Sequence, residues 1–174
     1  MKLSTRVATL LLGIIAALTM AVPTAAQATA NSSSGVLDAP TPGPFYQIRN
    51  YLHFECLAGK SNERVDIAHC NPSYNDQWWA LEPAGAAGFY RLRVAADGKC
   101  MAVLKNGNVR MSNCVADWND QWWRLDPVPG YTNMYTLYNH LRGTCLAAPT
   151  INGAARPFTC TPGYTDQYWS FLPR

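Results

Sequence analysis

The sequence predicts an all-β fold in which three copies of one unit close into a barrel with threefold symmetry, and three observations predict it. A set of spaced residues recurs with a period of 44 to 46 residues, which is typical of repeat architectures. Runs such as 90–94 and 108–111 alternate apolar and polar side chains, as half-buried strands do. Because no segment keeps a 3.6-residue period, we expect few and short helices. A three-bladed propeller is the alternative, but propellers typically need at least four blades.

The N-terminus carries the pattern of an export signal. Lys2 and Arg6 precede an apolar stretch, and small residues around Ala26 offer a cleavage site. A membrane anchor is the alternative, but the uninterrupted apolar run over 7–20 is short for a span of about twenty residues. No stop-transfer charge cluster follows it. We therefore predict a secreted, extracellular protein without membrane insertion.

The remaining chain divides at a change in composition. We assign residues 1–28 to the signal peptide and 29–44 to a flexible leader that is rich in Ser, Pro and Gly. The folded domain is expected over 45–174. Its three units span about residues 45–84, 89–128 and 134–174.

Composition narrows the classes of function. Charged residues make 14% of the chain and aromatic residues 11%, which excludes a disordered, highly charged chain. Without Lys2 and Arg6 the formal net charge of +3 falls to about +1, and no basic run remains. We therefore expect neutral partners and no nucleic acid.

Each unit opens on a strand that contains a tyrosine, and a cysteine follows this tyrosine by ten positions. A second cysteine follows the first by 14 or 15 positions. The three sets are Tyr46, Cys56 and Cys70, then Tyr90, Cys100 and Cys114, and finally Tyr135, Cys145 and Cys160.

Six cysteines in an exported chain predict disulfides, and six allow fifteen connectivities. Threefold symmetry leaves three uniform schemes, of which only one closes short loops within single units: Cys56–Cys70, Cys100–Cys114 and Cys145–Cys160. A zinc site or a catalytic thiol is the alternative. Because the Cys-x2-Cys spacing of zinc sites is absent and the three histidines occupy unmatched positions, we predict no metal site and no cofactor.

A Gln-x-Trp motif closes each unit, and its Gln stands seven residues after the second cysteine. The motif residues are Gln77 and Trp79, Gln121 and Trp123, and Gln167 and Trp169. Residues two apart on a strand share a face, so we expect both to face inward as structural core residues and the residue between them to face outward. A buried Gln amide needs partners, which we expect from backbone groups of the adjacent loop.

Three Gln-x-Trp units, each with an upstream cysteine pair, resemble the ricin B-type lectin domain, a β-trefoil, over about residues 45–174. The resemblance implies twelve short strands, arranged as a six-stranded barrel capped by three hairpins. It also implies one potential sugar pocket in each unit, and no catalytic residues.

The family's pocket elements identify the third unit as the best candidate site. A sugar-binding Asp commonly stands two residues after the first cysteine, where this chain has Ala58, Ala102 and Ala147. A polar residue precedes the motif Gln, here Asp76, Asp120 and Asp166. An aromatic platform stands two residues before the second cysteine, and only the third unit keeps a ring, Phe158. We therefore predict a carbohydrate site of Phe158 and Asp166, with Asn152 nearby in sequence.

Two sets of rings depart from the family's pattern. One ring stands three residues before each Gln (Tyr74, Trp118 and Tyr164), and another lies between Gln and Trp (Trp78, Trp122 and Tyr168). The first set, with Asp76, Asp120 and Asp166, gives three aromatic-plus-carboxylate patches suited to sugar. Alternatively, the rings of both sets plug the hairpin ends of the barrel.

The sequence leaves two functions open. The first is a monomeric glycan-binding module that binds weakly and gains from multivalency on a repetitive polymer. The second is a secreted protein-binding module, such as an inhibitor or a toxin-associated subunit, because the missing carboxylates remove the main sugar acceptor. An enzyme is not expected, because no recurring carboxylate pair, Ser-His-Asp set or phosphate loop is present.

Overall fold

The computed structural model describes residues 40–174. The predicted signal peptide and most of the predicted leader lie outside these residues. Within 40–174, no helix has the length and hydropathy that a bilayer crossing requires.

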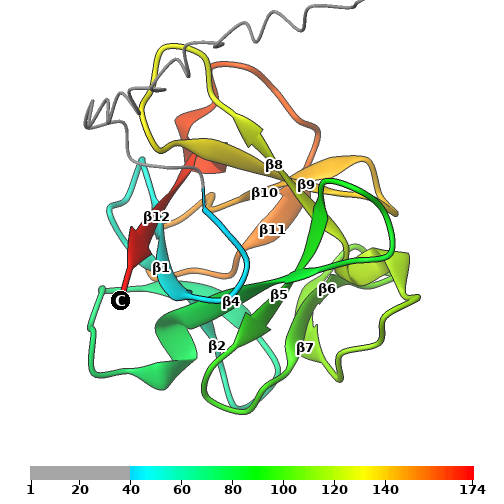
Figure 1. Cartoon of the computed structure of the whole chain (residues 1–174). Coiled ribbons are helices and arrows are strands. Elements are labelled where there is room, and N and C mark those ends of the chain that lie inside the picture. Colours follow the sequence, from blue (N-terminus) through cyan, green and yellow to red (C-terminus); the bar gives the residue numbers. More distant parts are fainter. Residues whose placement is uncertain (1–39) are drawn as a thin grey trace, which may run out of the picture. The chain divides into compact units, whose positions relative to one another are not determined.

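The described chain is all-β, as predicted (Figure 1). Its only helices are three short 3-10 turns in the described residues. The strands are β1 Phe45–Asn50, β2 Cys56–Gly59, β3 Val65–Ala68, β4 Trp78–Pro83, β5 Phe89–Val94, β6 Cys100–Val103, β7 Val109–Ser112, β8 Trp123–Pro127, β9 Tyr135–Asn139, β10 Thr144–Ala147, β11 Arg156–Phe158 and β12 Trp169–Pro173. The 3-10 turns are η1 Asn75–Gln77, η2 Asn119–Gln121 and η3 Thr165–Gln167.

Six strands close into an antiparallel ring in the order β1, β4, β5, β8, β9 and β12, and β12 pairs with β1 again. Within each unit, the opening tyrosine pairs with the motif tryptophan: Tyr46 with Trp79, Tyr90 with Trp123, and Tyr135 with Trp169. The ring leaves no unpaired edge strand, which is how small barrels protect their backbone groups.

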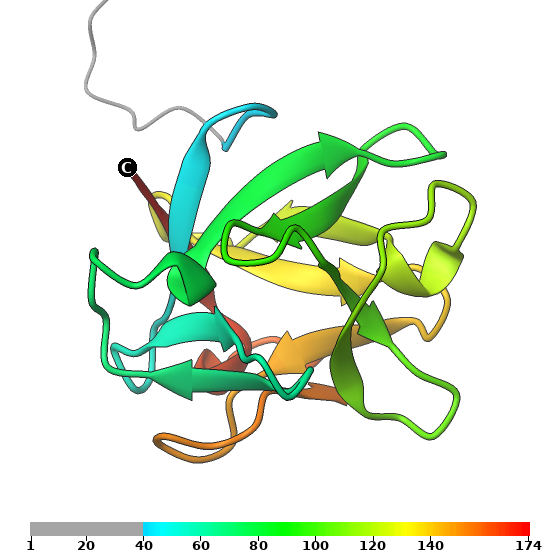
Figure 2. The same cartoon turned by 90° about the horizontal axis from the view of Figure 1, so that it is seen from below.

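Three hairpins, β2–β3, β6–β7 and β10–β11, cap one end of the ring. Strands β1, β5 and β9 run toward the hairpins, and β4, β8 and β12 run away from them, so the C-terminus lies at the opposite end (Figure 2). The hairpins also bond to one another: the Met111 N–H donates to the Glu63 carbonyl at 2.8 Å, and the Ala155 N–H donates to the Val65 carbonyl at 2.9 Å.

The motif tryptophans fill the core, with none of their surface exposed. Each indole N–H donates at 2.9 Å to the carbonyl of the residue after the first cysteine, namely Leu57, Met101 or Leu146. The three predicted disulfides are confirmed within their units. Each buried Gln amide bonds to backbone groups of its adjacent loop, as expected.

The expectation that the residue between Gln and Trp faces outward is wrong for Trp78 and Tyr168, which are 4% and 6% exposed. The loop before each 3-10 turn contacts these rings, the Arg174 guanidinium lies over the Trp78 ring at 5.3 Å from its centroid, and the Tyr131 ring packs against Tyr168. The Trp78 indole donates to the Pro72 carbonyl at 2.9 Å, and the Tyr168 hydroxyl accepts from the Gly163 N–H at 2.7 Å. Trp122 is half-buried and makes the equivalent bond to Ala116.

Candidate carbohydrate-binding site

The third unit holds a hollow of about 440 Å³ that contains three of the predicted site residues, Phe158, Tyr164 and Asp166. We call it the third-unit hollow. Its lining is Leu52, Pro149, Phe158, Thr159, Thr161, Tyr164, Asp166 and Gln167. The rings of Phe158 and Tyr164 are 45% and 58% exposed, so both offer an aromatic surface to a ligand beside a carboxylate.

The buried Gln167 shapes one wall of the third-unit hollow. Its amide oxygen accepts from the Thr161 N–H at 3.1 Å, and its amide nitrogen donates to the Thr159 carbonyl at 2.9 Å. Both threonines line the hollow. The motif glutamine therefore fixes the loop between Phe158 and Tyr164, because leaving either amide group unpaired in the interior would be costly.

A second buried amide, Asn50 at the end of β1, joins two walls that come from different units. Its Nδ2 donates to the Asp166 carbonyl at 2.8 Å, and its Oδ1 accepts from the backbone N–H of Leu52 at 3.1 Å. The Ala148 N–H also donates to the Asp166 carbonyl, at 2.9 Å. The backbone that carries the Asp166 carboxylate is therefore held from two sides.

The three equivalent carboxylates differ in their surroundings. Asp76 forms an ion pair with Lys60 at 2.9 Å. In Asp120, Oδ1 is buried without a hydrogen-bond partner, and burial raises the pKa of this carboxyl above its ordinary value. None of residues 40–174 forms an ion pair with Asp166, so its carboxylate is available to accept hydrogen bonds from sugar hydroxyls.

The remaining predicted residues lie outside the third-unit hollow. Tyr74 and Trp118 are 55% and 53% exposed in the first and second units, each beside its own carboxylate in sequence. Asn152 does not line the hollow. It adopts a left-handed backbone in the turn between β10 and β11, and its N–H donates to Glu55 Oε2 at 2.8 Å.

The alanines at the family's carboxylate position, Ala58, Ala102 and Ala147, are fully buried. The usual sugar acceptor is therefore replaced by core packing in all three units. Within residues 40–174, no group of His, Cys, Asp and Glu side chains could hold a metal ion. The third-unit hollow therefore offers two exposed rings and one carboxylate.

Sequence reasoning missed Leu52, Pro149 and Asn50. Leu52 and Asn50 belong to the first unit, more than 100 residues from Asp166 along the chain. One sequence feature could have singled out Asn50: an Asn stands four residues after the opening Tyr in the first and third units, as Asn50 and Asn139, whereas the second unit has Val94. An amide side chain at a strand position expected to be buried must form hydrogen bonds inside the protein.

A six-stranded barrel capped by three hairpins defines a β-trefoil. The family model described as a ricin-type β-trefoil lectin domain matches residues 44–169. The chain belongs to this family of carbohydrate-binding domains.

Solved structures share the fold at low sequence identity. The designed threefold-symmetric protein ThreeFoil is 18% identical, with a TM-score of 0.63 over 74% of this chain and 97% of that protein. SeviL, solved bound to asialo-GM1 saccharide, is 18% identical, with a TM-score of 0.62 over 74% of this chain and 96% of its own. A chain of the cytolethal distending toxin from Actinobacillus actinomycetemcomitans is 18% identical, with a TM-score of 0.66 over 76% and 92%. No curated protein matches the chain.

Proposed function

We propose that this protein is a secreted, non-enzymatic glycan-binding module whose main site is the third-unit hollow. The observation that carries the proposal is the grouping of two exposed rings, Phe158 and Tyr164, with the Asp166 carboxylate. A flat ring packs against the apolar C–H face of a sugar, and a carboxylate accepts from its hydroxyls. SeviL, of the same fold, was solved with a saccharide, which supports this class of ligand.

Binding at a single site should be weak, because the third-unit hollow is open and has one carboxylate. The exposed rings Tyr74 and Trp118 give the first and second units a contact surface as well. On a repetitive polymer these surfaces would act together with the third unit and raise the apparent affinity through effective concentration. Secretion is supported by the N-terminal pattern and by the three disulfides, which persist in oxidising compartments.

The proposal is tested with the secreted protein on a glycan array and on insoluble polysaccharides. We expect Tyr164→Ala and Asp166→Asn to weaken retention by about 10- to 100-fold, because each removes an anchor or an acceptor. The matched controls are Trp118→Ala and Asp120→Asn, at the equivalent positions of the second unit, and these should change single-site affinity by less than about threefold. Absence of retention on any glycan would refute the proposal, and equal losses in both units would remove the third unit's special role.

A protein partner is the second candidate, and the buried alanines at the family's carboxylate position favour it. A pocket without its main acceptor loses orientation, while exposed rings are good anchors for a protein surface. Co-purification from native culture fluid separates the two candidates. A stoichiometric protein that sugar does not displace would support this second function.

A further inference from the structure

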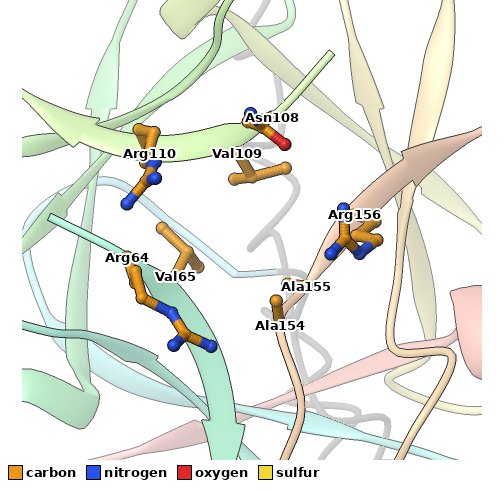
Figure 3. Close-up of a pocket in the computed structure, with 8 residues that line it drawn as sticks. All are labelled: Arg64, Val65, Asn108, Val109, Arg110, Ala154, Ala155 and Arg156. Carbon is orange, nitrogen blue, oxygen red and sulfur yellow. The ribbon is translucent and has the colours of Figure 1, made fainter. Parts of the chain in front are cut away.

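A second hollow, of about 330 Å³, lies where the three hairpins meet at the capped end of the barrel (Figure 3). We call it the axial hollow. It shares no residue with the third-unit hollow. Its lining includes three arginines, Arg64, Arg110 and Arg156, and each comes from a different hairpin.

The floor of the axial hollow is apolar and closed. Val65, Val109 and Ala155 stand at equivalent positions, five residues before the second cysteine of each unit, and they are 1%, 5% and 2% exposed. The hydrogen bond from Ala155 to Val65 and a bridge between Arg64 and Arg110 tie the rims together. The backbone that carries the arginines is therefore held in place, which reduces the entropic cost of ordering them around a ligand.

The arginines of the axial hollow are under-compensated in charge. Arg110 and Arg156 are equivalent, four residues before the second cysteine, and neither forms an ion pair within residues 40–174. The first unit has Asp66 at this position, and its carboxylate forms an ion pair with Arg64 at 3.0 Å. Arg64 and Arg110 also face each other across their bridge, and like charges directly opposite are unfavourable.

Most other cationic side chains that lie near carboxylates are already paired. Lys60 pairs with Asp76, Lys99 with Glu63, and Arg124 with Asp126. The three arginines and Asp66 leave an excess of about two positive charges at the axial hollow. A small anion needs only the hollow.

We propose that the axial hollow binds a phosphate or sulfate group, either as the free ion or as a monoester on a small sugar. Figure 3 shows Arg64 and Arg110 on one side of the hollow and Arg156 on the other, so an anion between them would be approached from three hairpins. The planar guanidinium group presents paired N–H donors that match two oxygens of such an anion. Asn108, which also lines the hollow, adds a neutral amide. The volume of the axial hollow, about 330 Å³, is at the lower end of the range for small-molecule pockets.

The test uses the secreted protein and calorimetric titration with sodium phosphate, sodium sulfate and a hexose 6-phosphate, with sodium chloride at matched ionic strength as the reference. We expect binding of the divalent anions that chloride does not reproduce. The variant Arg110→Gln with Arg156→Gln should weaken it at least tenfold. Arg174→Gln removes one positive charge at the opposite end of the barrel and should leave it unchanged. Tighter binding of the hexose ester than of inorganic phosphate would identify a sugar monoester as the ligand, and equal binding would identify the free ion.

Thermal unfolding gives a second readout that does not depend on a measurable titration. Phosphate should raise the Tm of the natural protein and not that of the double variant, because a ligand stabilises only the fold that binds it. In chloride the double variant should be at least as stable as the natural protein, since like-charge repulsion is relieved. Absence of an effect specific to phosphate or sulfate, or the same loss with Arg174→Gln, would overturn the proposal. Glycan retention by the third-unit hollow should survive in the double variant, so the two proposals fail separately.

Discussion

At the scale of single residues, buried amides decide the shape of the third-unit hollow. Gln167 fixes the loop that separates its two rings, and Asn50 links the Leu52 backbone to the Asp166 backbone. Neither side chain is available to a ligand, because Gln167 is 2% and Asn50 is 0% exposed. In the proposed site both therefore act as positioning residues for the backbone of the residues that line the hollow.

The role of Asn50 can be separated from its contribution to stability. We expect Asn50→Val to lower the free energy of unfolding by about 1–3 kcal/mol, because backbone groups lose their partner, and to weaken glycan retention about tenfold. Valine fits the site in shape, since Val94 stands at the equivalent position of the second unit. Denaturant unfolding and polysaccharide binding are the two measurements.

The matched control for Asn50 is Asn139→Val. Asn139 is equally buried and donates to the Asp120 carbonyl at 2.8 Å in the second unit. This variant should lose similar stability and keep third-unit binding. Equal binding losses in the two variants would show that Asn50 acts only through global stability.

The sequence predicts those residues of the third-unit hollow that lie close together along the chain. Phe158, Tyr164 and Asp166 lie within nine residues of one another, on the segment that runs from the end of β11 to η3. Asn50 and Leu52 reach the same place through the pairing of β1 with β12. This long-range register depends on ring closure and is not encoded in any short window of sequence.

At the scale of elements, each capping hairpin is a short pair of strands with a disulfide at its base. The loops between paired cysteines are nearly equal, with separations of 14, 14 and 15 residues. The hairpins differ in strand length, because β11 has three residues where β3 and β7 have four. Phe158 is the last residue of this shortest strand, pairs with Cys145 across the hairpin and stands two residues before Cys160, so the disulfide lies beside it.

Removing single disulfides should therefore separate stability from binding. We expect Cys145→Ala with Cys160→Ala, and Cys100→Ala with Cys114→Ala, to cost about 3 kcal/mol of unfolding free energy each, from the loop-entropy estimate. Only the first pair should also weaken glycan retention, because it frees the strand that carries Phe158. Retention is compared at a temperature at which circular dichroism shows both variants folded. Equal retention by the two variants would mean that the β10–β11 hairpin orders Phe158 without its disulfide.

The strand pattern was predictable because each unit repeats its spacing, so the same evidence appears three times. The covering of Trp78 and Tyr168 was not predictable, because alternation along a strand tells which face a ring takes and not what lies over that face. The loop before each 3-10 turn forms one hydrogen bond with each ring, Arg174 lies over Trp78, and Tyr131 packs against Tyr168. The different surroundings of Asp76 and Asp166 were not predictable for a similar reason. Lys60 forms an ion pair with Asp76, whereas Pro149 lines the hollow beside Asp166.

At the scale of the whole molecule, the ring makes the two ends of the folded chain neighbours. The Arg174 N–H donates to the Phe45 carbonyl at 3.0 Å, and β12 pairs with β1 along its length. The third-unit hollow lies across this junction, because Asn50 and Leu52 stand on one side of it and Asp166 on the other. The site is thus shared between the first and last units and depends on closure of the barrel.

A circular permutant tests this dependence. We join residue 174 to residue 45 through a short linker and open the chain between Ala87 and Gly88, in the exposed turn between β4 and β5. The permutant should fold, with a Tm within about 5 °C of a linear 45–174 chain, because exposed turns tolerate such changes. Its retention on the glycan should match that chain within about twofold, since the first and third units are now covalently continuous.

A second permutant, opened between Leu52 and His53, gives the matched comparison. It keeps every barrel strand intact but cuts the segment in which Asn50 holds the backbone of Leu52 and His53. The ring should still close, because its six strands and their pairings are unchanged, whereas one wall of the third-unit hollow loses its anchorage. We expect a folded protein by circular dichroism with glycan retention at least tenfold weaker. Full retention in this permutant would show that recognition resides in the 158–167 segment alone. Failure of the first permutant to fold would show that the order of the units along the chain matters as well as their arrangement in the ring.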